Sequence, residues 1–279
     1  MTDLDTLLAP KIVALNPPKI LTIDIERVPG RAKVKHRGLT IEGDFWDLSG
    51  WKHTIGRRIH PDDVTEWPRT ICAAWRWYGN KRVEFTAEWD ADNEAMLQRT
   101  WELYHQADIV VGHNLAGFDT KKLSGEWNLL GLGKPSPWKT VDTLKVARSQ
   151  FGYESNTLDA LCKRLGIVAK TDRYNVEMAR AACAGDTAAQ RRICRYNKGD
   201  IVATEGFYDY VRGWIPNHPH IGLWSGEERS CSNCGSTDLQ AEGWTRTAVT
   251  SYAQLHCKNC QAWLRQNHRK AIVTTRIAR

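Results

Sequence analysis

The sequence of 279 residues contains no run of about 18 apolar residues, which excludes an ordinary membrane-spanning helix. Its first residues, MTDLDTLLAP, lack the basic-then-apolar order of a secretory signal. It also has no internal repeat and no low-complexity tract. We therefore expect a cytoplasmic protein without a membrane partner, whose eight cysteines are not paired as disulfides.

Positive charge is concentrated in two segments of the chain. Residues 31–60 hold seven Lys or Arg against three Asp or Glu, and residues 217–279 hold eight against four. Since the whole chain carries +7, the remainder is close to neutral. Such segments indicate a polyanionic partner, although a solvated basic surface has the same composition. Any of the thirteen Trp beside these segments could stack on unpaired bases.

The order of β-rich and helical patterns predicts an α/β fold, with a mixed sheet flanked by helices. A strand over 20–26 precedes a turn-rich insert over 28–68, and the β-rich segments 70–78 and 82–89 suit a hairpin. A helix over 92–106, a buried strand over 107–114, and helices from about 119, over 157–167 and over 188–214 follow. We predict a first domain over 1–214, a linker over 215–230 that has two Pro and no periodicity, and a small domain over 231–279.

The first strand, LTIDIERVPG, carries an acidic pair. Alternation with period two places Asp24 and Glu26 on one face of the strand. Two like charges there repel each other unless a positive group lies between them. An edge strand can carry such a pair for solubility alone, so the pair predicts a metal site only if the chain supplies other ligands.

Two later segments supply further carboxylates. In VGHNLAGFDTKKL, Asn114 lies in the loop after a buried strand, and Asp119 lies at the start of a helix, where open α/β sheets place their ligands. A plain N-cap is the alternative role for Asp119. In YNKGDIVATEGFY, Tyr196 and Asp200 are one helical turn apart, at the margin of an apolar face. That face consists of Ile193, Ile201, Tyr208 and Val211.

The order DxE, N-x3-FD, Y-x3-D over residues 20–212 resembles the DEDD superfamily of 3′–5′ exonucleases, which has the RNase H-like fold. The segment 141–167, with its DT pair and its S/N-x-L helix, is similar to the middle of that family. One branch has a His five residues before the last Asp, where this chain has Arg195. The other branch has a Tyr four residues before it, which Tyr196 matches.

The resemblance implies two Mg²⁺ or Mn²⁺ ions, since hard divalent cations take oxygen ligands. Asp24, Glu26 and Asp200 would hold one ion, and Asp24 and Asp119 would help to hold the second. Tyr196 would orient the attacking water. With an ordinary pKa near 10, a phenol suits positioning better than proton abstraction.

Four of the eight cysteines have the spacing of a zinc site. Cys231-x2-Cys234 and Cys257-x2-Cys260 are separated by 22 residues, which predicts a zinc ribbon with one structural Zn²⁺. His256, beside the second pair, is expected to be a neighbour and not a ligand. The other four cysteines lack metal spacing and are expected to be buried as small side chains.

We therefore expect a metal-dependent 3′–5′ exonuclease that acts on nucleic acid, most of all on single-stranded DNA, with a replication or repair protein as a possible further partner. Two alternatives are an exoribonuclease of the same fold and a non-catalytic protein that binds nucleic acid through the ribbon. The residue pattern does not separate DNA from RNA, because recognition of the 2′-OH depends on few contacts. Asn114, Trp46 and Trp51 are the candidate substrate-binding residues, although the two Trp suit anchoring of the basic insert equally well.

Overall fold

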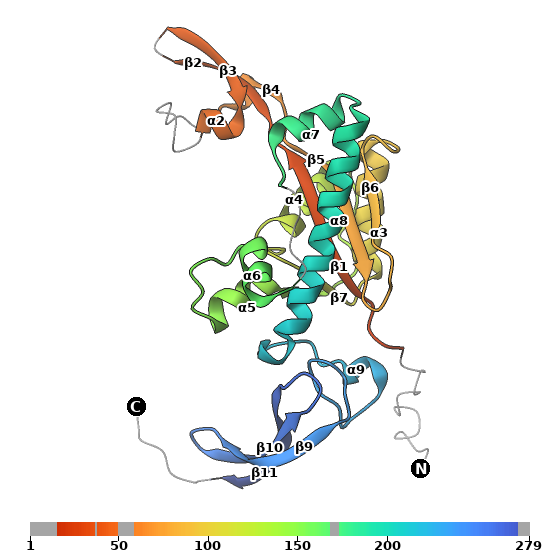
Figure 1. The fold of residues 1–279 in the computed structure, drawn as a ribbon, viewed down its shortest axis with the longest axis vertical. Coiled ribbons are helices and arrows are strands. Elements are labelled where there is room, and N and C mark those ends of the chain that lie inside the picture. Colours follow the sequence, from red (N-terminus) through yellow and green to blue (C-terminus); the bar gives the residue numbers. More distant parts are fainter. Residues whose placement is uncertain (1–15, 37, 50–58, 168–172, 273–279) are drawn as a thin grey trace, which may run out of the picture. The chain divides into compact units, whose positions relative to one another are not determined.

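The computed structural model describes residues 16–36, 38–49, 59–167 and 173–272 (Figure 1). The described chain divides into two compact units, one of Lys19–Tyr208 and one that contains the region from Asp209. None of the helices in these residues is both long enough and apolar enough to cross a membrane.

The first unit is built on a mixed five-stranded sheet in the order β6-β5-β1-β7-β8. Its strands are β1 (Ile20–Val28), β5 (Arg69–Trp77), β6 (Glu84–Ala87), β7 (Ile109–Gly112) and β8 (Lys139–Asp142). The pairs β1–β5 and β5–β6 are antiparallel, whereas β1–β7 and β7–β8 are parallel. The expected mixed α/β sheet and its β5–β6 hairpin are confirmed.

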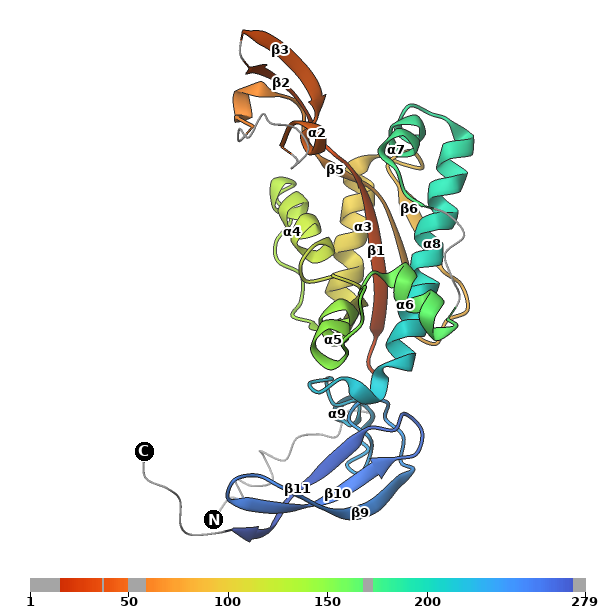
Figure 2. The same ribbon diagram turned by 60° about the vertical axis from the view of Figure 1, so that its left-hand side comes forward.

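Helices cover both faces of this sheet (Figure 2). They are α3 (Asn93–Gln106), α4 (Asp119–Leu129), α5 (Thr143–Gln150), α6 (Leu158–Leu165), α7 (Val176–Cys183) and α8 (Thr187–Tyr210). Local signals fix several ends: Asp92 caps α3 by accepting the Ala95 N–H at 2.7 Å, and Gly166 ends α6 at a φ of +68°. The sequence analysis did not predict α7, whose cap is Asn175.

Two apolar clusters lie on opposite sides of the sheet. One joins β1, β5 and β7 to α3 and α4, and the other joins β1, β5 and β6 to α7 and α8. The alternation in β1 decides which residue enters which side: Leu21, Ile23 and Ile25 belong to the first cluster. Asp24 and Glu26 therefore lie on the side of α7 and α8.

Strand β1 has partners of unequal length. It pairs with β5 from Leu21 to Val28, but β7 pairs only with Ile20, Leu21 and Thr22. Because β7 ends at Gly112, the second half of β1 has no strand on that edge within the described residues. The backbone N–H and C=O groups on that edge therefore need hydrogen-bond partners outside the sheet.

The insert after β1 forms a second sheet, in the order β3-β2-β4. Its elements are β2 (Arg31–His36), β3 (Leu39–Asp44), α2 (Phe45–Ser49), the 3₁₀ turn η1 (Pro61–Asp63) and β4 (Val64–Glu66). The sequence analysis described this insert as turn-rich and assigned no strands to it. The strand β2 nevertheless alternates, with Ala32 and Val34 buried against Leu48, and Lys33 and Lys35 exposed.

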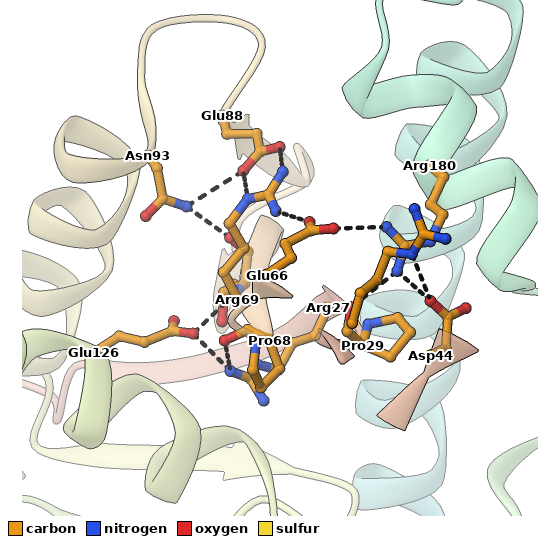
Figure 3. Close-up of polar contacts among 12 residues, drawn as sticks. Arg27, Pro29, Asp44, Glu66, Pro68, Arg69, Glu88, Asn93, Glu126 and Arg180 are labelled. Carbon is orange, nitrogen blue, oxygen red and sulfur yellow. Dashed lines mark hydrogen bonds and ion pairs between the residues drawn. The ribbon is translucent and has the colours of Figure 1, made fainter. Parts of the chain in front are cut away.

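An ion-pair network joins this insert to the body of the first unit (Figure 3). Arg180 on α7 bonds the Glu66 carboxylate at 3.0 Å and also bonds Asp44. Glu66 bonds Arg69 at 2.6 Å, and Arg69 in turn bonds Glu88 at 2.8 Å. The two sheets are thus connected through side chains as well as through the chain itself.

The second unit contains a three-stranded antiparallel sheet, in the order β11-β10-β9. Its elements are η2 (Arg212–Trp214), α9 (Gly222–Ser225), β9 (Leu239–Arg246), β10 (Thr250–Cys257) and β11 (Trp263–Ile272). Asn233 donates to the carbonyls of Arg212 and Ile215, at 2.8 and 2.9 Å. The segment expected to be a linker, 215–230, holds α9 and bonds to this unit, and the predicted domain boundaries stay a prediction.

We predict that Arg180→Ala lowers the free energy of unfolding by about 1–3 kcal/mol, because it removes one cationic partner from each of the partly buried carboxylates of Asp44 and Glu66. Urea denaturation measures the change. The matched control is Arg164→Ala, which removes an exposed ion pair with Glu154 and should cost clearly less stability than Arg180→Ala. Equal losses in the two variants would contradict a structural role for the Arg180 network.

Candidate functional site

Three carboxylates from distant parts of the sequence meet in the first unit. Asp24 and Glu26 from β1 and Asp200 from α8 each offer an oxygen atom within 4.8 Å of the others. The residues paired with Asp24 and Glu26 on β5 are Ala74 and Cys72, whose small side chains leave space on this face. Of the four acids that the sequence analysis predicted as metal ligands, these three lie together, and we call them the acidic group.

The spacing of this group suits a hard divalent cation. Mg²⁺ takes oxygen ligands at about 2.0–2.1 Å, so that opposite ligands lie roughly 4.2 Å apart. Oxygens within 4.8 Å of one another need only small shifts to bind one ion. Asp200 is buried, and Asp24 and Glu26 are half-buried.

Asn197 is a member of this site that the sequence analysis missed. Its side chain is fully buried, and its Nδ2 donates to Asp24 Oδ2 at 2.6 Å. Its Oδ1 lies 3.9 Å from the Cys72 sulfur. The available signal was its position three residues before Asp200, on the same side of α8.

Asp119 lies close to this group but is not one of its three members. It is the first residue of α4, it is buried, and its Oδ1 accepts the Ile25 N–H at 3.2 Å. Phe118 occupies the N-cap position of α4, so the interpretation of Asp119 as an N-cap is wrong. Burial, together with the charges of Asp142 and Asp200, raises the pKa of Asp119 to about 7.

Asp142 holds the loop that leads to Asp119. Its carboxylate accepts the backbone N–H groups of Asn114, Ala116 and Leu144 at 3.0–3.1 Å. Asn114 itself has a φ of +69° and an exposed side chain. Its predicted contact with substrate stays a prediction.

Tyr196 lies on α8, one turn before Asp200, and is half-buried. Burial and the charges of Asp200, Glu26 and Asp24 raise the pKa of this phenol, which therefore keeps its proton at neutral pH. The ring of Tyr174 lies 6.4 Å away between centroids, and its hydroxyl donates to the Arg27 carbonyl. The side chain of Trp46 and the whole of Trp51 lie outside the described residues.

The four predicted cysteines form a second cluster, in the second unit. The sulfurs of Cys231 and Cys260, and those of Cys234 and Cys257, are 3.6 Å apart. All four lie within 4.8 Å of one another. A tetrahedral Zn²⁺ with Zn–S bonds of about 2.3 Å places its sulfurs roughly 3.8 Å apart, so the cluster suggests zinc.

We predict one zinc per purified chain, measured by elemental analysis. Cys260→Ser should abolish zinc retention and loosen the second unit, because metal binding supplies folding free energy to so small a core. The control is Cys194→Ser, which changes a half-buried thiol outside the cluster and should keep the zinc. Retention of zinc by Cys260→Ser, as by the control, would contradict this site.

None of the curated proteins matches the chain. The solved structure of the family B DNA polymerase from the hyperthermophilic archaeon Pyrobaculum calidifontis is similar, at 15% identity and a TM-score of 0.49. The similarity covers 84% of this chain and 32% of the polymerase, so this chain spans about a third of that protein.

A family model described as the RNase_H superfamily matches residues 68–212. The matched segment contains Asp119, Tyr196 and Asp200 and begins after β1, which carries Asp24 and Glu26. Because the match spans more than half of the 279 residues, this chain belongs to the RNase H superfamily.

Proposed function

We propose that this chain is a metal-dependent 3′–5′ exonuclease that hydrolyses phosphodiester bonds at the 3′ ends of single-stranded DNA. The observation that supports the proposal is the convergence of Asp24, Glu26 and Asp200 within 4.8 Å, with Tyr196 one helical turn from Asp200. The 3′ polarity and the single-strand preference rest on the resemblance of the motif order to DEDD exonucleases.

The acidic group suits one divalent cation, and Asp119 beside it would allow for a second. Asp24, Glu26 and Asp200 would hold one ion, and Asp24 and Asp119 would help to hold the second. Bound Mg²⁺ or Mn²⁺ would lower the pKa of the attacking water and stabilise the charge on the phosphate and the leaving oxygen. Support for Asp119 in this role comes from its hydrogen bond to Ile25, the residue between Asp24 and Glu26.

The chain's own residues fix the geometry for this chemistry. The Asn197 amide donates to one oxygen of Asp24 and so restrains the orientation of that carboxylate. The buried face of α8, with Ile193 and Ile201 fully buried, sets the depth of Asp200. Tyr196 keeps its proton at neutral pH, so its hydroxyl can donate a hydrogen bond that orients the water but does not act as the base.

The first test is digestion of 5′-labelled single-stranded DNA, duplex DNA and RNA with Mg²⁺, Mn²⁺ or EDTA. We expect progressive shortening of single-stranded DNA from the 3′ end, and none in EDTA. Asp24→Asn and Asp200→Asn should each lower turnover by at least about 100-fold, because each removes charge that the transition state needs.

The matched control for these variants is Glu205→Gln on the same helix. Glu205 is also a buried carboxylate, but it forms an ion pair with the Arg76 guanidinium, at an N–O distance of 2.7 Å. This variant should lose stability while cleavage in its folded fraction stays near that of the wild type. Wild-type cleavage by Asp24→Asn would refute the proposal, and preferred digestion of RNA would assign the activity to an exoribonuclease.

Tyr196→Phe should lower kcat by about 10- to 100-fold with little change in KM, since it removes a hydrogen bond that orients water without removing substrate contacts. Steady-state kinetics on short labelled oligonucleotides measure both constants. Tyr174→Phe is the matched control: it removes a neighbouring phenol that bonds the Arg27 carbonyl, and it should change stability more than kcat. A raised KM at unchanged kcat in Tyr196→Phe would instead indicate substrate binding.

A further inference from the structure

One face of the sheet in the second unit carries a row of aromatic and basic side chains. In β10 and β11, His256 pairs with Trp263, and Gln254 pairs with Arg265. Paired residues in antiparallel strands project to the same side, and so do residues two apart along a strand. We call the side that carries Tyr252, Gln254, His256, Trp263 and Arg265 the ribbon face.

Two stacked pairs hold the rings of the ribbon face in fixed orientations. The rings of His256 and Trp263 are nearly parallel, at 7° and 4.4 Å between centroids. The Arg265 guanidinium lies over the Tyr252 ring, at 4.6 Å. The Trp263 side chain is nevertheless 54% exposed, so a large preoriented aromatic surface remains open to a ligand.

The segment that contains this face is net positive in its sequence. Residues 231–279 contain seven Lys or Arg against two Asp or Glu. One of the two acids, Glu242, is bonded by Lys258 at 2.8 Å and by His256 at 3.3 Å. The exposed Arg265 has no ion pair with any residue that the structure describes. Its donors are therefore available to an external anion.

We propose that the ribbon face binds single-stranded nucleic acid, with a base stacked on Trp263 and a phosphate bonded by Arg265. Positions 263 and 265 lie about 6.7 Å apart along the strand and on one side of it. An extended nucleic-acid strand can therefore place a base on the first and a phosphate on the second. Exposed aromatic rings interleaved with cations favour a nucleic acid over an acidic protein, because every base offers a face for stacking. The choice of nucleic acid as the ligand rests on the proposed function.

The test measures binding of a labelled oligothymidylate of about 30 nucleotides to the full chain, by fluorescence anisotropy without added divalent cation or chelator. Trp263→Ala should raise Kd by about tenfold with an unchanged salt slope. Arg265→Ala should lower the slope of log K against log salt by about 0.7, the value for one lost phosphate contact. Zinc content and thermal unfolding establish that each variant is folded.

Trp244→Ala is the matched control. Trp244 is 45% exposed on the same sheet, but it pairs with Ala253, whose position between Tyr252 and Gln254 places it on the opposite face. Its Kd should stay within about twofold of the wild type. If Trp263→Ala loses its zinc, the salt slope of Arg265→Ala decides the question.

Unchanged binding in both ribbon-face variants, or an equal loss in Trp244→Ala, would overturn the proposal and leave the face to a protein partner. Cleavage of an oligonucleotide of about five residues, measured separately with Mg²⁺, tests the nuclease proposal. The two proposals can therefore fail independently, because the binding measurement does not require cleavage.

Discussion

Repulsion among carboxylates is the constraint that the first unit has to satisfy. Three acidic oxygens lie within 4.8 Å of one another, and at an effective dielectric constant of about 20 each such pair of charges costs about 3.5 kcal/mol or more. The fold has to offset this cost elsewhere. It does so with apolar clusters on both sides of the sheet, and with the Arg76–Glu205 ion pair that joins α8 to β5. Helix α8 thereby holds Asp200 against a repulsion that a bound cation would relieve.

The unequal pairing of β1 explains why the site lies where it does. Because β7 ends at Gly112, the Ile25 N–H has no strand partner on that edge and takes the Asp119 carboxylate instead. The loop between β7 and α4 has to bring Asp119 to that point. Asp142 holds the loop there through backbone N–H groups, so a carboxylate at the end of β8 positions another at the start of α4. The ends of two parallel strands thus organise the site, as is general in open α/β sheets.

The sequence predicted those features of the two sites that follow from residue spacing within one strand, one helix or one cysteine motif. Period two placed Asp24 and Glu26 together, helical spacing placed Tyr196 beside Asp200, and cysteine spacing located the second cluster. Asn197 was missed because its partner, Asp24, is 173 residues away, and its spacing from Asp200 alone does not distinguish it from any other polar residue of the helix. Asp119 suited a cap by local rules, but the unpaired backbone of β1 captures it instead. The strands of the insert were missed because only Ala32 and Val34 mark the buried side of β2, and so short an alternation does not stand out in a turn-rich segment.

The proposed activity requires attraction for a polyanionic substrate, and the carboxylates of the site cannot supply it. Four ionised carboxylates carry a charge of −4, and two divalent cations carry +4, so the loaded site would be close to neutral and would add little long-range attraction for a polyanion. Without ions it would repel a phosphate backbone. Affinity for nucleic acid therefore has to come from other surfaces. The net positive charge of residues 231–279 and the exposed rings of the ribbon face are suited to supply it. Their contribution would weaken with added salt, whereas the chemistry at the carboxylates would depend mainly on the divalent cation.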